Sequence, residues 1–144
     1  MKIKENIFGI AELLSSAVLT AGSVSVFAAC GEHEGKYMAC HWAQNAVTLI
    51  GALLVISALI RLFTRDNGVR AGIAVTQFLF SAAAALIPGT VINLCMMETM
   101  RCHTIFKPAV IIIAVISAAV SGADAFITIR RTDRSVYVPE NAAA

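Results

Sequence analysis

The chain has 144 residues, of which 58% are hydrophobic and 14% are charged, and its formal net charge is +2. Soluble domains usually contain about 45–50% apolar and about 25% charged residues, so this composition indicates an integral membrane protein that contacts the lipid bilayer. The small net charge and the scattered basic residues argue against nucleic-acid binding, because nucleic-acid-binding proteins typically carry a basic stripe with interleaved aromatic side chains.

Four apolar runs follow one another along the chain. Each is long enough to cross a hydrocarbon core about 30 Å thick as a helix. A soluble four-helix bundle would instead need a charged face on every helix, and these runs have none. The sequence therefore predicts an all-α bundle of four transmembrane helices, over residues 7–29, 43–60, 71–94 and 108–129.

The segments between the runs are polar. Two loops, 30–41 and 95–107, contain all four cysteines and all three histidines, and a charged turn at 61–70 separates the second run from the third. Pro88-Gly89 is expected to kink or loosen the end of the third helix. We expect residues 1–131 to form one transmembrane domain and 132–144 to be a polar, poorly ordered tail.

Basic residues near the helix ends predict the orientation, because cytoplasmic segments are enriched in Lys and Arg. One side holds Lys2, Lys4, Arg61, Arg65, Arg70, Arg130, Arg131 and Arg134, and the other holds Lys36, Arg101 and Lys107. We therefore expect a multi-pass protein of the cell membrane, with both termini cytoplasmic. The two cysteine loops would face outward, where oxidation can occur.

The N-terminal segment also fits a second interpretation. Residues 1–29 have a basic start and an apolar middle, and they end in F-A-A before Cys30, which resembles a lipoprotein signal with Cys30 as the lipidated residue. Cys95, however, follows the third apolar run in the same way, where no signal peptide can lie. The four-helix interpretation is therefore favoured.

The two halves of the chain look duplicated, as residues 7–66 and 70–131. G-I-A at 9–11 recurs at 72–74, and each cysteine loop closes with M-x-C-H, at 38–41 and at 100–103. Both copies run outward and then back, so the repeat is parallel. We expect a pseudo-two-fold axis along the membrane normal, which would bring the two M-x-C-H motifs together.

The cysteine positions favour one disulfide in each loop, Cys30 with Cys40 and Cys95 with Cys102. Each bridge would tie the end of an outgoing helix to the start of the returning one. In the chain-entropy model, a loop of this size gains about 2–3 kcal/mol from such a bridge.

Metal or haem binding is an alternative use of the same loops. Thiolate and thioether donors suit Cu(I), and thiolate with imidazole suits zinc. The adjacent Cys-His pairs do not match the usual zinc spacings, and the chain has no C-x-x-C-H for covalent haem. The candidate ligands are Met38, Cys40, His41, Met100, Cys102 and His103.

Redox catalysis is a further alternative. In outline the chain resembles the disulfide-forming quinone reductases and the vitamin K epoxide reductases, which are membrane proteins with outward cysteine pairs. Those families use a C-x-x-C pair. The cysteines of this chain are spaced more widely, so no residue role carries over.

Two carboxylates lie within the apolar runs, Glu12 in the first and Asp124 in the fourth. Intramembrane carboxylates can mark a path for ions or protons, and they can equally be interfacial or paired. Arg61 is a candidate partner for either. Small residues four apart, such as Ser117 with Ser121, suit close packing of helices.

The cysteine loops also carry a family resemblance. Cys30, then M-A-C-H-W at 38–42, and a second cysteine followed by M-x-C-H resemble the prokaryotic membrane proteins grouped as domain of unknown function 4418, up to about Arg131. The resemblance implies no catalytic residues. It suggests an association with ABC transporters whose permeases carry extracellular domains.

These observations favour a non-enzymatic accessory or interaction subunit, because no ATP-binding glycine loop, nucleophile with a base or hydrolase motif is present. We expect no cofactor, contact with a membrane permease, and two disulfide-tied outer loops. A homo-oligomer would also fit, since four helices are few for a transport path. A thiol-disulfide oxidoreductase or a copper- or haem-binding protein remains the alternative.

Overall fold

The computed structural model describes residues 2–28, 39–94 and 101–141, and side chains within 7–28, 39–94 and 101–133. Within these ranges the fold is all-helical and without strands, and the four long helices are all apolar enough to cross a membrane. The elements are α1 (Lys2–Val24), α2 (Ala39–Phe63), α3 (Asn67–Leu86), the short π-helix η1 (Cys102–Phe106) and α4 (Lys107–Asn141). The predicted fold class of four membrane-spanning helices is thus confirmed.

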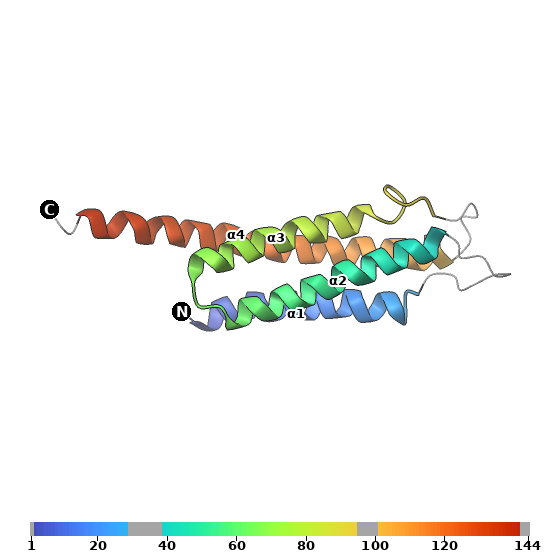
Figure 1. Cartoon of the computed structure of the whole chain (residues 1–144), viewed down its shortest axis with the longest axis horizontal. Coiled ribbons are helices and arrows are strands. Elements are labelled where there is room, and N and C mark those ends of the chain that lie inside the picture. The colour runs from blue at the N-terminus through green and yellow to red at the C-terminus, as the bar shows by residue number, and fades with distance from the viewer. Residues whose placement is uncertain (1, 29–38, 95–100, 142–144) are drawn as a thin grey trace.

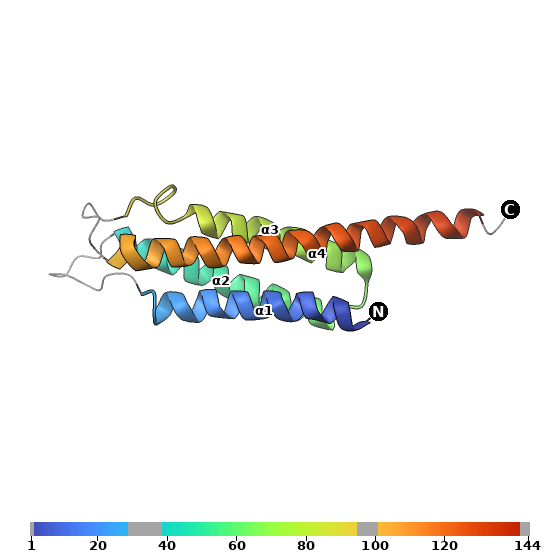
Figure 2. The ribbon, with the colours of Figure 1, turned by 180° about the vertical axis from the view of Figure 1, so that it is seen from behind.

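The four helices run antiparallel to their neighbours in the chain, as two helical hairpins side by side (Figure 1). The most extensive contacts are within the hairpins, between α1 and α2 and between α3 and α4. Figure 2 shows from behind that α1 begins and α4 ends at the same end of the bundle. The start of α2, with Cys40, and η1, with Cys102, therefore lie at the opposite end.

Each helix buries a narrow seam and turns a broad apolar face outward. In α2 the buried residues recur every three or four positions, at Cys40, Ala43, Val47, Gly51, Leu54, Ala58 and Arg61. The outward face carries large side chains such as Leu49, Leu53 and Ile56. This pattern suits a bundle in lipid, where outward apolar side chains carry no hydration cost and close packing holds the helices together.

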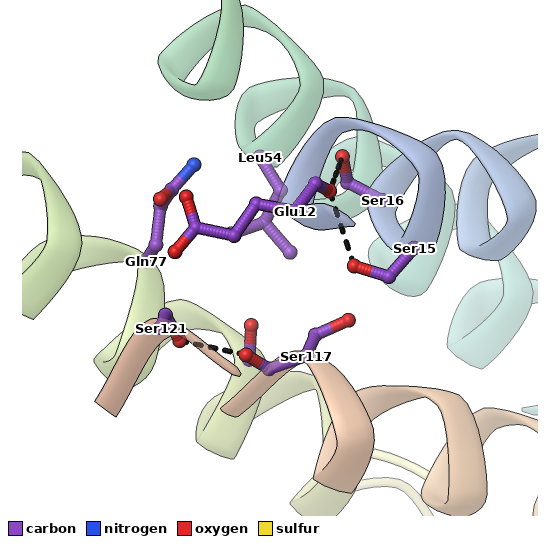
Figure 3. Close-up of a pocket in the computed structure, with 8 residues that line it drawn as sticks. Glu12, Ser15, Ser16, Leu54, Gln77, Ser117 and Ser121 are labelled. Atoms are coloured by element: carbon purple, nitrogen blue, oxygen red, sulfur yellow. Dashed lines mark hydrogen bonds between the residues drawn. The ribbon is translucent and has the colours of Figure 1, made fainter. Parts of the chain in front are cut away.

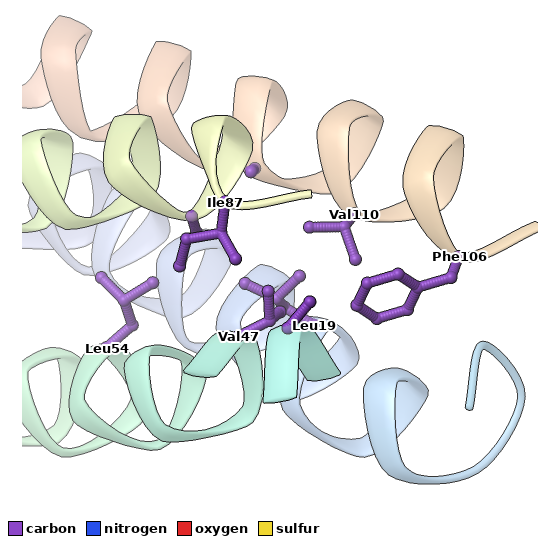
Figure 4. Packing of buried hydrophobic residues seen from close by; sticks show 9 residues of the cluster. Leu19, Val47, Leu54, Ile87, Phe106 and Val110 are labelled. Carbon is purple, nitrogen blue, oxygen red and sulfur yellow. The ribbon is translucent and has the colours of Figure 1, made fainter. Parts of the chain in front are cut away.

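The hydrophobic core is formed by side chains from all four long helices and from η1 (Figure 4). Leu19 from α1, Val47 from α2 and Phe106 from η1 are fully buried and meet Ile87 and Val110. The same cluster also contains the small buried residues Ala43, Ala84 and Ala114. The core therefore combines large and small side chains.

The third helix ends earlier than the predicted run of 71–94. Pro88 has no N–H to continue the helix, and Gly89 has φ 92°, which favours glycine. The Ile87 N–H still bonds Ala83 O (3.2 Å), and the Ile92 N–H bonds Ile87 O (3.1 Å). The apolar run therefore ends in a compact turn and not in a kinked last turn.

The fourth helix is longer than predicted at both ends. It starts with a π-helical turn at Cys102–Phe106 and continues to Asn141, so most of the tail expected to be poorly ordered is helical. At about 1.5 Å per residue, α4 is much longer than a hydrocarbon core about 30 Å thick. In both overall views it projects past the other helices (Figures 1 and 2).

Close approach of α1 and α2 depends on Gly51. A Cβ atom there would lie 2.5 Å from Thr20 Oγ1, and Thr20 is held by its hydrogen bond to Ser16 O (2.8 Å). We expect Gly51→Ala to destabilise the bundle by about 1–3 kcal/mol through overpacking. Unfolding in mixed micelles measures this loss.

Gly72→Ala is the matched control, because a Cβ at Gly72 meets nothing within 4 Å. It should leave stability unchanged or raise it slightly, since alanine has the higher helix propensity. Equal losses at both positions would contradict the close packing of α1 on α2.

Candidate functional site

Arg61 joins two carboxylates from other helices inside the bundle. Its Nη1 donates to Glu12 Oε2 of α1 at 2.5 Å, and its Nη2 pairs with Asp124 Oδ2 of α4. The three residues are 1%, 4% and 3% exposed. Both carboxylates are therefore paired inside the bundle, and Arg61, which was counted among the cytoplasmic-side charges, is a core residue.

Gln77 of α3, the remaining long helix, also belongs to this cluster. With its amide nitrogen toward Glu12, it donates to Glu12 Oε1 (3.2 Å) and Oε2 (2.5 Å). Its oxygen then accepts from the Ala58 N–H (3.1 Å) and from Ser57 Oγ (3.3 Å). The opposite orientation would bring two oxygens together, so we assign the amide by this network. Each of the four helices thus supplies one side chain to the cluster.

The charge cluster, defined here as Glu12, Arg61, Gln77 and Asp124, is not neutral when both carboxylates are ionised. It then contains two negative charges and one positive charge. A buried uncompensated charge costs several kcal/mol even after relaxation of its surroundings. The arrangement therefore favours one further positive charge close to the carboxylates.

A small cavity adjoins Glu12, and five of its eight lining residues are serines (Figure 3). The cavity has a volume of about 10 Å³, which is close to the minimum that one water molecule needs. In Figure 3, Ser117 on α4 lies opposite Glu12 and Ser15 on α1. The lining residues are Glu12, Ser15, Ser16, Leu54, Gln77, Ser81, Ser117 and Ser121.

At the other end of the bundle, the structure describes half of the predicted cysteine site. Cys40 and Cys102 are fully buried, each near the start of a returning helix segment. The His41 ring lies edge-on to Trp42, with centroids 6.4 Å apart, and His103 lies in η1.

Other members of the predicted sites, Cys30, Met38, Cys95 and Met100, lie outside the described residues. The two disulfides and the metal site at M-x-C-H therefore remain predictions. Among the residues that the structure describes, no group of three Cys, His, Asp or Glu side chains is arranged for a metal ion.

The sequence analysis identified Glu12, Asp124 and Arg61, but it did not predict that Gln77 and the serines lie beside them. One signal was available: Glu12 and Gln77, like Ser16 and Ser81, are 65 residues apart, as are Cys30 and Cys95. Aligning the halves on their cysteines would have paired these polar residues. The two G-I-A strings are 63 residues apart, and Gly9 is buried whereas Gly72 is exposed. An alignment of the halves on these strings therefore does not pair the polar residues.

Comparison with known proteins gives one match, and it spans most of the chain. A family model described as a domain of unknown function (DUF4418) matches residues 12–127, which includes the charge cluster and both cysteine loops. No curated protein and no solved structure matches the chain. Because the match covers most of the sequence, the chain belongs to the DUF4418 family.

Proposed function

We propose that the chain is a non-enzymatic subunit of the cell membrane that binds another integral membrane protein, a transporter permease. The observation that carries this proposal is the end of α4, which continues past the other three helices (Figure 2). A helix that extends beyond its own bundle offers a docking element.

The described part of α4 that follows Asp124 has a mixed apolar and basic surface. Phe126 is 57% exposed, Ile127 and Ile129 are also exposed, and the Arg130 guanidinium lies 4.1 Å from the centre of the Phe126 ring. An open groove of about 440 Å³ is lined by Phe126, Ile127, Arg130, Arg131 and Asp133. Such a surface suits the membrane boundary of a partner with apolar and acidic side chains.

We also propose that the fold consists of two parallel repeats. Buried positions support this: Leu19 corresponds to Ala84 at a spacing of 65, and Val47 to Val110 at a spacing of 63. Arg61 and Asp124 share the spacing of 63, whereas Cys40 and Cys102 are 62 apart. A π-helical turn accommodates one extra residue, so η1 accounts for this difference.

Photo-crosslinking tests the docking proposal. A photoreactive amino acid at Phe126 or Ile129 should give one discrete adduct with a membrane permease in native membranes. The matched control is Leu14, which is 61% exposed on α1 and should give no such adduct. Adducts with lipid alone from all three positions would contradict the proposal.

In this account the outer loops are tied by the pairs Cys30–Cys40 and Cys95–Cys102, with both loops outside the cell. Counting thiols on the purified, unfolded chain tests this. We expect no reactive thiol before reduction and four after it, with no bound metal and no visible chromophore. Four thiols before reduction with stoichiometric copper or haem would instead favour metal binding, and exchange of a cysteine pair with a quinone would favour redox catalysis.

A further inference from the structure

The cavity beside Glu12 lies where the two proposed repeats meet, and both contribute to its lining. Three corresponding pairs surround it: Glu12 with Gln77, Ser16 with Ser81, and Leu54 with Ser117. In secondary transporters built from repeats, sites for substrates and ions lie at the repeat interface near the middle of the bilayer. The position is therefore one where a ligand site is expected.

The serines offer oxygen lone pairs to this cavity. Ser16 donates its hydroxyl proton to Glu12 O (2.7 Å), Ser15 donates to the same oxygen (3.1 Å), and Ser121 donates to Ser117 O (2.7 Å). A hydroxyl that has donated its proton to its own helix can only accept a further contact. Acceptor oxygens beside a carboxylate suit a cation and not an anion.

Ser117 gives an independent indication that something binds here. It is 5% exposed, it lines the cavity, and its Oγ makes no hydrogen bond to any residue that the structure describes. A buried polar atom without a partner costs about 1–3 kcal/mol. A bound ion or water in the cavity would remove this cost.

The charges around the cavity select the sign of the ligand. Glu12 faces it from α1, Arg61 of α2 and Asp124 of α4 complete the ion pairs, and Gln77 of α3 is uncharged. We infer that the cavity binds one small monovalent cation at the Glu12 carboxylate, either a proton held on its carboxyl group or a sodium ion, with the serine oxygens completing the contacts of the site. This cation supplies the positive charge that the charge cluster lacks.

The sodium arm of the test uses the full chain in nanodiscs. Binding of radioactive sodium is measured at constant ionic strength, with choline as the replacement cation. If sodium is the ligand, the chain binds one ion, Glu12→Gln abolishes binding, and Ser117→Ala weakens it on the order of tenfold, as expected for one lost contact. Ser25→Ala is the control, because Ser25 is exposed just after the end of α1 and does not line the cavity. This variant should bind sodium like the original chain.

The proton arm uses infrared difference spectra of the same samples as the pH is raised. If a proton is the ligand, sodium does not bind, and one protonated carboxyl band disappears with release of one proton per chain. Glu12→Gln removes this band, while Ser117→Ala shifts its frequency because the hydrogen-bonding environment changes.

Both arms are decisive even if one variant fails to fold, because the original chain and Ser117→Ala suffice for each. Glu12→Gln should fold, since it leaves one carboxylate for Arg61. The inference would be overturned if the chain neither bound sodium nor released a proton from a buried carboxyl group, because the cavity would then hold neutral water alone.

Discussion

Arg61→Ala should lower the free energy of unfolding by about 3–5 kcal/mol, because it leaves the carboxylates of Glu12 and Asp124 buried without their cation. Unfolding against the mole fraction of SDS in mixed micelles, followed by pulse proteolysis, measures the change. Arg65→Ala is the control: Arg65 is exposed four residues later, and its removal should change stability by less than about 0.5 kcal/mol.

A neutral replacement of the ion pairs separates charge from packing. The triple variant Arg61→Met, Glu12→Gln and Asp124→Asn should recover most of the loss, because a buried ionic group can often be replaced by neutral side chains without net cost. A loss below about 1 kcal/mol for Arg61→Ala alone would mean that water already reaches the carboxylates.

Phe106→Ala should destabilise the bundle by about 3 kcal/mol or more, because a fully buried ring is removed from the core next to Leu19 and Val110. In lipid this loss comes from packing and from the cavity left behind, since the unfolded helices remain in an apolar solvent. The same SDS unfolding assay measures it.

Phe126→Ala is the matched aromatic control. Phe126 lies on α4, which continues directly from η1, and its ring is largely exposed. We expect a change below about 0.5 kcal/mol. Phe106→Leu should fall between the two, since it keeps most of the apolar contact. Similar losses for Phe106→Ala and Phe126→Ala would show that the core is not packed as described.

The sequence predicted the number and approximate positions of the helices, because the length of an apolar run directly reflects the thickness of the bilayer. It was less accurate at helix ends. Hydropathy could not show that Pro88 and Gly89 end α3 in a turn, or that α4 continues to Asn141. A helix that leaves the membrane can satisfy its backbone groups in water, so polarity alone does not mark its end.

The charge cluster was predictable only in part. Charged residues in apolar runs identify Glu12 and Asp124, and a nearby arginine suggests their partner. Their convergence with Gln77 depends on how the four helices are rotated about their axes. That rotation is set by side-chain packing, such as Thr20 against Gly51, which periodicity within one helix does not reveal.

The charge cluster joins residues at corresponding positions of the two repeats proposed above. Exchanging its members between the halves tests this claim, through the quadruple variant Glu12→Gln, Arg61→Asp, Gln77→Glu and Asp124→Arg. If the halves correspond, the cluster is rebuilt in mirrored order, and the stability of the quadruple variant in mixed micelles returns to within about 1 kcal/mol of the original chain. Arg61→Asp alone should lose at least as much as Arg61→Ala, and a quadruple variant as unstable as Arg61→Asp would contradict the account.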